Sequence, residues 1–308
     1  MAPSCLNSPR VETVAVVSPG AMGSAVADAL ARGGVRVVAT LAGRSERTAR
    51  LAERAPLELL PDLDAVVREA DVVLSIVPPE AAAAVAAEIH CCLRALPPAD
   101  EGEPCGSELQ GRLPLFVDLN AVAPVTVRAI AASGLQLVDG SISGPPPWRP
   151  GTTRVYLSGP RAREVAALPF EGVERIVVGD EVGAASAVKM STASVYKGTT
   201  ALLAQALRAA HANGVLDHVL ADLEAVAPDL VGNLERRIAV AASKSGRYVG
   251  EMQEIAATQE AADLTPVLFE AIAEIYAEIA ETPLGRADPE DVASTQPLDD
   301  VLARLRRP

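Results

Sequence analysis

The chain has 308 residues, of which 49% are hydrophobic and only 3% are aromatic, so its core must be built from Ala, Val and Leu. Its formal net charge is −13 and it has no block of basic residues, which argues against a nucleic-acid binder. We expect a cytoplasmic protein, because no apolar window is long enough for a membrane span and the first ten residues lack the apolar core of a signal peptide.

Cysteine usage predicts no metal site. Cys91 and Cys92 are adjacent, and neither they nor the remaining Cys5 and Cys105 have the spacing of zinc ligands. Reduced thiols are the expected state in a cytoplasmic protein.

The first half of the chain alternates β-rich runs with helical patterns. Strands are expected at 13–18, 35–41, 71–78, 115–120, 135–142, 154–159 and 175–179. Helices are expected at 21–32, 45–54, 80–96 and 124–133. Several of the strands are continuous apolar runs, as in a sheet covered on both faces. The alternation predicts a Rossmann-type α/β domain with a doubly wound, mostly parallel sheet over residues 11–182, and a Pro- and Gly-rich surface loop at 96–114.

The second half has no convincing strand. A long helix is expected over 184–212, ending at Asn213-Gly214, and it links the two halves as an interdomain segment at 183–213. Shorter helices are expected at 216–226, 228–243, 247–262 and 265–281. They predict an all-α domain over 214–284, followed by a polar tail at 285–308 that wraps the surface or frays.

The segment VETVAVVSPGAMGSAVADAL, residues 11–30, nearly matches the G-x-G-x-x-G turn that binds a dinucleotide pyrophosphate. Gly20 and Gly23 match the second and third glycines, whereas Ser18 stands in place of the first. A turn at this place, after the first strand and before a helix, favours nucleotide binding over a purely structural role. The residues expected to contact the cofactor here are Ser18, Pro19, Gly20, Ala21, Met22 and Gly23.

The end of the second strand favours NADP(H) over NAD(H). An acid for the adenosine ribose is missing there, and Arg44 and Ser45 stand before the first acid, Glu46. Arg and Ser suit a 2′-phosphate that an acid would repel. A solvated helix start with Ser45 as its N-cap is the alternative, and both can hold together.

Four later motifs fall at the C-terminal ends of expected strands, where α/β sheets place ligands. They are IVPP (76–79), DLNAVAP (118–124), DGSISGPPPWRPGTTRVYLSGP (139–160) and GDEVGAASAVKMSTASVYKG (179–198).

Taken in order with the first turn, these motifs resemble the β-hydroxyacid dehydrogenase superfamily over nearly the whole chain. That group includes 3-hydroxyisobutyrate, tartronate-semialdehyde and 6-phosphogluconate dehydrogenases, with imine reductases as divergent relatives. The patterns K-M-x-x-A-x-x-x-K-G at 189–198 and R-x-x-G-E-M-x-E-I-A at 247–256 resemble the branch with a DUF1932 C-terminal domain.

The resemblance implies roles for matching positions. Ser143 and Gly144 match the substrate-clasping Ser-Gly, and Lys189 matches the catalytic lysine. Val77 and Pro78, with Asn120 where the family has a Ser-Thr pair, are implied at the cofactor.

Lys189 also makes chemical sense without the family. It lies in the apolar, small-residue segment AASAVKMSTAS, where desolvation disfavours the charged amine and so assists proton transfer. A snorkelling surface lysine is the alternative.

The chain departs from the family pattern in the helical half. Ala193 replaces the Asn expected four residues after the lysine, so Thr192, Ser194 or Tyr196 would supply that polar contact. Lys197 can bind an anionic substrate group, lower the proton affinity of Lys189, or be a solvated charge.

The family's substrate lysine in the C-terminal domain is also missing, and Arg247 is a candidate in its place. An ion pair between Arg247 and Glu251, one helical turn apart, is the alternative. These departures argue against plain 3-hydroxyisobutyrate as the substrate.

Other polar residues carry less information. Trp148 and Arg149 either wall the substrate pocket or pack within their loop, and the sequence does not choose between these. His211 and His218 are interpreted as structural, since no nucleophile or carboxylate has triad spacing to them.

The combined interpretation is an NADP(H)-dependent oxidoreductase that interconverts a β-hydroxy acid, or a similar anionic alcohol, with its carbonyl. An imine or ketimine reductase is the first alternative, although relatives with that activity usually replace the lysine. A non-catalytic nucleotide-binding protein is the second. We expect a homodimer formed through the α-helical C-terminal domain.

Overall fold

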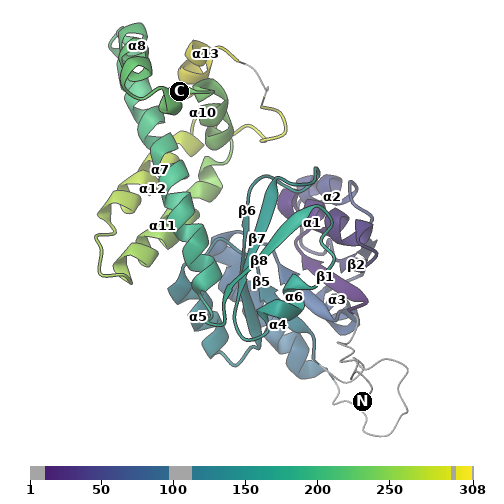
Figure 1. Cartoon of the computed structure of the whole chain (residues 1–308). Coiled ribbons are helices and arrows are strands. Elements are labelled where there is room, and N and C mark those ends of the chain that lie inside the picture. Colours follow the sequence, from purple (N-terminus) through teal and green to yellow (C-terminus); the bar gives the residue numbers. More distant parts are fainter. Residues whose placement is uncertain (1–10, 97–112, 293–295, 307–308) are drawn as a thin grey trace, which may run out of the picture. The chain divides into compact units, whose positions relative to one another are not determined.

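The computed structural model describes residues 11–96, 113–292 and 296–306. The chain divides into two compact units, Met1–Lys189 (unit 1) and Met190–Pro308 (unit 2), shown in Figure 1. The expected surface loop at 96–114 falls almost entirely outside the described residues.

Unit 1 contains an eight-stranded sheet with the strand order β3-β2-β1-β4-β5-β6-β7-β8. Every neighbouring pair is parallel except β6 and β7, which run antiparallel, so the expected doubly wound, mostly parallel sheet is confirmed. The strands are β1 Thr13–Val17, β2 Arg36–Ala39, β3 Glu58–Leu59, β4 Val72–Ser75, β5 Leu115–Asp118, β6 Leu137–Ser143, β7 Thr153–Ser158 and β8 Val173–Gly179.

Helices cover both faces of this sheet (Figure 1). On β1, Val14 and Val16 pack with residues of α1 and α6, whereas Ala15 and Val17 pack with residues of α3, α4 and α5. Both faces are therefore buried, which explains the continuous apolar runs in the sequence. The helices of unit 1 are α1 Ala21–Arg32, α2 Glu46–Ala52, α3 Leu63–Glu69, α4 Pro79–Ala95, α5 Pro124–Ala132 and α6 Ala162–Ala166.

The strand order reverses at β1, which pairs with β2 on one side and with β4 on the other. Val17 at the end of β1 lies in register with Ser75 at the end of β4. The connections that follow these two strands therefore diverge to opposite sides of a common point. Such a switch point is where open α/β sheets bind their ligands.

Unit 2 is helical in the part of the chain that the structure describes. Its first helix, α7, spans Ala184–Ala212, as expected, and the boundary between the units falls within it. The later helices are α8 Leu216–Val226, α9 Pro228–Val231, α10 Leu234–Ala242, α11 Ser245–Glu260, α12 Val267–Ala280 and α13 Leu298–Arg304.

The structure differs from the sequence-based expectation at three places. The two-residue strand β3 and the short helices α3 and α6 were not expected, because elements this short leave no clear periodicity. The helix expected at 228–243 is interrupted between α9 and α10, where Asn233 adopts a left-handed φ of 54°.

The third difference lies in the C-terminal tail, which was expected to be polar and to wrap the surface or fray. It forms α13, which packs on α10, and it buries Val301, Leu302 and Leu305. The apolar residues in this tail are few, but their spacing places them on one face of a helix.

Among the described residues, no helix is both long enough and apolar enough to cross a bilayer.

Candidate active site

The turn after β1 contains a backbone conformation that favours glycine. Ser18, which stands in place of the first glycine of the motif, adopts a left-handed φ of 69°. The N–H of Gly20 donates to the Ser18 carbonyl over 2.8 Å, and the Ser24 hydroxyl donates to the Pro19 carbonyl over 2.6 Å. Ser18 does not cap the helix, because the N-cap of α1 is Gly20 and no side chain caps it.

The two glycines of this turn are needed for different reasons. A Cβ on Gly23 would lie 2.4 Å from the Ser18 carbonyl oxygen, so α1 can approach β1 only if residue 23 is glycine. A Cβ on Gly20 would meet nothing within 4 Å, and its φ of −75° suits any residue. The protein itself therefore does not require glycine at position 20. Its missing side chain leaves the N-terminus of α1, with its unpaired N–H groups, open to an anion.

The end of β2 places a cation and a helix start together. Ser45 is the N-cap of α2 and accepts a hydrogen bond of 3.2 Å from the Thr48 N–H, as the alternative interpretation had it. Arg44 is part-buried, and its Nε is buried without a hydrogen-bond partner among the described residues. A buried guanidinium nitrogen without an acceptor is rare in folded proteins, and a ligand oxygen at this place would satisfy it.

Asn120 proves to be a link between strand ends. Its side-chain oxygen accepts from the Val77 N–H over 2.7 Å, and its amide nitrogen donates to Ser75 Oγ over 3.1 Å and to Asp118 Oδ2 over 3.0 Å. Asn120 is 2% exposed. The polar atoms of this side chain are therefore used within the protein, which argues against the expected contact of Asn120 with a cofactor. Asn120 instead fixes the backbone of Val77, which stays a candidate contact together with Pro78.

Lys189 lies beside the expected substrate clasp. Its Nζ donates a 2.7 Å hydrogen bond to the carbonyl oxygen of Ile142, which immediately precedes Ser143 and Gly144. The side chain is part-buried. Gly144 has φ 109°, and a Cβ there would lie 2.3 Å from the Thr152 carbonyl oxygen, so the clasp turn requires glycine. The structure thus brings together a lysine amine and a tight turn that the sequence separates by some 45 residues.

Asp139, which sequence reasoning did not single out, lies at the centre of the contact between β6 and α7. It is fully buried, and its carboxylate accepts hydrogen bonds from Ser158, Gly183, Ala185 and Ser186. The available signal was its place at the start of the motif at 139–160, four residues before Ser143.

The loop after β6 is held by packing. The Arg54 guanidinium lies 4.4 Å from the centroid of the Trp148 ring, and the Pro147 carbonyl accepts from Arg32. Trp148 therefore packs its loop against Arg54 within unit 1, whereas Arg149 is exposed.

In unit 2, Lys197 is neither a solvated charge nor an available anion ligand. It is 4% exposed and forms an ion pair with Glu251, which is equally buried. Its Nζ also lies 4.1 Å from the centroid of the Tyr248 ring. The expectation that Lys197 binds substrate is therefore corrected, because a buried carboxylate already neutralises its charge. This pair joins the two branch-specific motifs at 189–198 and 247–256.

Arg247 is available at the rim of this ion pair. Its Nε lies 3.1 Å from Glu251 Oε1, which confirms the ion pair suggested by their spacing, yet half of its side chain is exposed. Burial lowers the pKa of the nearby Lys244, and the positive charge of Arg247 lowers it further. Thr192 is exposed. The exposed part of the Arg247 side chain keeps it a candidate for contact with an anionic group.

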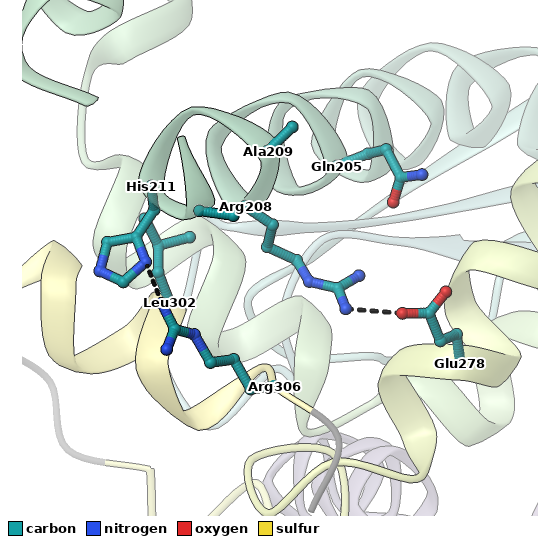
Figure 2. Close-up of a pocket in the computed structure, with 8 residues that line it drawn as sticks. Gln205, Arg208, Ala209, His211, Glu278, Leu302 and Arg306 are labelled. Atoms are coloured by element: carbon teal, nitrogen blue, oxygen red, sulfur yellow. Dashed lines mark hydrogen bonds and ion pairs between the residues drawn. The ribbon is translucent and has the colours of Figure 1, made fainter. Parts of the chain in front are cut away.

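A hollow of about 310 Å³ on unit 2 is lined by none of the expected site residues (Figure 2). Arg208 pairs with Glu278 over 2.6 Å, and Arg306 contacts His211 Nδ1 over 3.0 Å. His211 thus has a structural contact, as expected. Among the described residues, no group of three or more His, Cys, Asp or Glu side chains is arranged to hold a metal ion.

Two family models match separate parts of the chain. Residues 13–95 match "NADP oxidoreductase coenzyme F420-dependent", and residues 210–279 match the domain of unknown function DUF1932. The first match includes the turn after β1, Arg44 and the end of β4. The second confirms the expected C-terminal domain.

Solved structures match almost the whole chain. A conserved protein of unknown function, described as structurally similar to 3-hydroxyacid dehydrogenases, is 28% identical, with a TM-score of 0.61 over 87% of this chain and 96% of its own. A 3-hydroxyisobutyrate dehydrogenase from Mycobacterium tuberculosis is 20% identical, with a TM-score of 0.64 over 96% of this chain and 100% of its own. An imine reductase from Myxococcus stipitatus, in complex with NADP+, is 20% identical, with a TM-score of 0.50 over 95% of this chain and 99% of its own.

The chain therefore has the fold of the 3-hydroxyisobutyrate dehydrogenase-like proteins, and the resemblance expected from its motifs is confirmed. These comparisons support an NAD(P)-dependent dehydrogenase or reductase.

Proposed function

We propose that this protein is an NADP(H)-dependent oxidoreductase that interconverts a β-hydroxy acid, or a similar anionic alcohol, with the corresponding carbonyl compound. The observation that carries the proposal is the position of Lys189. Its amine hydrogen-bonds to the carbonyl of Ile142, next to the Ser143-Gly144 turn. A proton-transfer group and a candidate anion clasp thus lie at one edge of a nucleotide-binding sheet.

The residues of this edge fit a dinucleotide phosphate. The open N-terminus of α1 at Gly20 suits the pyrophosphate, and the unpaired Nε of Arg44 suits a 2′-phosphate. Ser45 can add a hydroxyl while it caps α2. Bound here, the nicotinamide would accept or supply a hydride.

Lys189 supplies the proton chemistry in this proposal. During oxidation its neutral amine takes the hydroxyl proton of the substrate as the carbon–hydrogen bond breaks and the carbonyl forms. During reduction its ammonium group gives that proton back to the developing alkoxide. Ser143 offers a hydroxyl and backbone donors to the anionic group of the substrate, and Gly144 provides the tight turn. Arg247, in unit 2, stays a separate candidate for binding an anionic group.

The test is a screen of β-hydroxy acids with NADP+, followed by the absorbance of NADPH. With a substrate found, Lys189→Ala should lower kcat by about 10²- to 10⁴-fold, the usual range for a general acid or base. Fluorescence titration should show NADPH affinity unchanged. Lys189→Arg is the matched control for charge, and it should be nearly as inactive because a guanidinium does not give up its proton.

Three results would change the proposal. Full turnover by Lys189→Ala would refute the mechanism. Turnover of cyclic imines without any hydroxy acid would favour the imine reductase alternative. Tight NADPH binding without any reaction would favour a non-catalytic role.

We also propose that the protein is a homodimer formed through unit 2. Val195 and Leu202 lie seven residues apart on α7, hence on one face of the helix, and are 67% and 65% exposed. Apolar side chains with this exposure suit a contact with a second copy of the chain. Light scattering should give twice the 31.8 kDa mass of one chain, and a monomer would contradict the proposal.

A further inference from the structure

Asp139 holds the first turn of α7 through both of its carboxylate oxygens. Oδ2 accepts from Ser158 Oγ over 2.8 Å, from the Gly183 N–H over 2.8 Å and from the Ala185 N–H over 3.0 Å. Oδ2 also accepts from the Ser186 N–H over 3.2 Å, and Oδ1 accepts from Ser186 Oγ over 2.7 Å. The carboxylate therefore pairs N–H groups that the start of a helix leaves without partners, at the positive end of the helix dipole.

The same strand makes two more contacts with α7, in order along both elements. The Ser141 hydroxyl donates to the Ala185 carbonyl over 2.8 Å, and the Ile142 carbonyl accepts from Lys189 Nζ over 2.7 Å. Along β6, the first contact is therefore with the N-terminus of α7 and the last is with Lys189. Because the contacts share one strand, a shift of the helix start displaces Lys189 relative to Ile142.

Because the groups are buried, the hydrogen bonds between β6 and α7 are costly to break. Asp139, Ser141, Ser158 and Ser186 are all at most 1% exposed. A buried carboxylate that loses its donors, or buried donors that lose their carboxylate, leave unpaired polar groups. The local structure therefore has one well-defined register between β6 and α7.

We propose that Asp139 is a positioning residue, which fixes the start of α7 and thereby holds the Lys189 amine beside the Ser143-Gly144 turn. The importance of Asp139 for catalysis rests on the proposed function, but the effect of Asp139 on Lys189 can be measured without a substrate. Without this hold on the start of α7, the Lys189 amine loses its hydrogen bond to the Ile142 carbonyl and becomes more accessible to an acylating reagent.

The test is the pH dependence of lysine acetylation in Asp139→Asn, measured site by site by mass spectrometry of the full-length protein. The chain has only three lysines, Lys189, Lys197 and Lys244, so the other two are internal references. We expect the labelling rate of Lys189 near neutral pH to rise by about threefold or more, because its amine is no longer held by the Ile142 carbonyl. Lys244 should keep its wild-type rate.

Val165→Ala controls for a loss of stability alone. Val165 is fully buried on α6 and takes no part in the hydrogen bonds between β6 and α7, so we expect its truncation to weaken unit 1 while those hydrogen bonds persist. Ser158→Ala is the milder second variant should Asp139→Asn fail to fold, because it removes one donor to Asp139 and one acceptor of the Ala185 N–H but keeps the Asp139 carboxylate. It should raise Lys189 labelling less than Asp139→Asn does.

A wild-type labelling profile for Lys189 in a folded Asp139→Asn, or in Ser158→Ala where Asp139→Asn does not fold, would overturn the proposal. So would an equal rise at Lys189 in Val165→Ala. If labelling changes as expected and a substrate is known, kcat should fall by about a hundredfold with NADPH affinity retained. If labelling changes but no hydroxy acid is turned over, the positioning role stands and the proposed reaction fails.

Discussion

The proposed preference for NADP(H) over NAD(H) can be tested at a single side chain, Arg44. Its Nε is buried and lacks a partner among the described residues. Arg44→Ala should weaken NADPH binding by about tenfold or more, because a charge-assisted hydrogen bond to phosphate contributes about 1.5–3 kcal/mol. NADH binding should change by less than about twofold, since NADH has no 2′-phosphate. Fluorescence titration with both nucleotides measures the difference.

Arg50→Ala is the matched control, because Arg50 is an exposed cation on α2, the short helix that begins just after Arg44. It should leave both affinities near their wild-type values. An equal loss of NADPH and NADH affinity in Arg44→Ala would show that Arg44 supports the loop and does not recognise the 2′-phosphate.

Ser18 gives a second prediction for a single residue. A non-glycine residue at φ 69° is strained by about 1 kcal/mol, so Ser18→Gly should leave the free energy of unfolding unchanged or raise it by at most about that amount. Ser18→Val should lower it by more than about 1 kcal/mol, since a branched Cβ is poorly tolerated at positive φ. Urea unfolding measures the free energy of unfolding of both variants. Equal values would contradict the claim that the backbone at Ser18 is strained.

Some side-chain positions could be predicted from the sequence, and others could not. The order of the motifs placed Lys189 and Ser143-Gly144 at one edge of the sheet correctly. It did not show that Asn120 would use its amide to join two strand ends, or that Lys197 would find Glu251 some 54 positions away. Such pairings depend on which helix faces meet, and a single sequence does not encode that in its local pattern.

Among the elements, the turn between β1 and α1 contains two glycines whose replacement by alanine should have different effects. Gly20→Ala should fold with wild-type stability, because its Cβ meets nothing within 4 Å, and it should weaken NADPH binding by filling the space in front of α1. Gly23→Ala should lower the free energy of unfolding by about 1–3 kcal/mol, because its Cβ would lie 2.4 Å from the Ser18 oxygen.

Thermal unfolding and NADPH titration of both variants separate the two effects. If Gly20→Ala binds NADPH as tightly as the wild type, the N-terminus of α1 is not the phosphate site. If Gly23→Ala is as stable as the wild type, β1 and α1 can separate more easily than their contact suggests.

The elements show which signals a sequence carries. Helices α1, α7 and α8 match their expected ranges, because apolar periodicity is long there and glycines follow two of them. The break between α9 and α10 was missed, because Gly232-Asn233 interrupts a continuous helical pattern only through its backbone conformation. Helix α13 was missed because its few apolar residues stand in a Pro-containing, acidic segment, and only their burial against α10 reveals them.

For the molecule as a whole, the two units have different kinds of core. The core of unit 1 is almost entirely aliphatic, with Phe116 and Phe170 as its fully buried rings. Unit 2 instead holds three of the four tyrosines of the chain near the pair of Lys197 with Glu251. Rings with a titratable hydroxyl make the stability of unit 2 sensitive to alkaline pH, whereas an aliphatic core is not.

Tyr276 is the most buried of the three, at 1% exposure, and its hydroxyl donates to the Lys197 carbonyl over 2.8 Å. Its ring makes an edge-to-face contact with Tyr248 at 5.2 Å. Burial raises the pKa of Tyr276 well above its ordinary value of 10.0, and burial likewise raises that of Tyr248. The folded state therefore keeps these protons after the unfolded chain has lost them.

The sign of the pH effect follows from this difference. Below about pH 10 both states are protonated and the contribution of Tyr276 to stability is fully present, and above about pH 10 it is lost as the unfolded chain ionises. We expect helical circular dichroism to fall, and tyrosinate absorbance to rise with it, as the pH increases beyond that point. Tyr276→Phe should be less stable by about 1 kcal/mol at neutral pH, having lost a hydrogen bond, but should lose less stability between pH 10 and 12. Tyr156→Phe, on β7 in unit 1, is the control, and its stability should change with pH as that of the wild type does. If the stability of Tyr276→Phe also falls with pH in parallel with the wild type, the alkaline sensitivity lies elsewhere in the molecule.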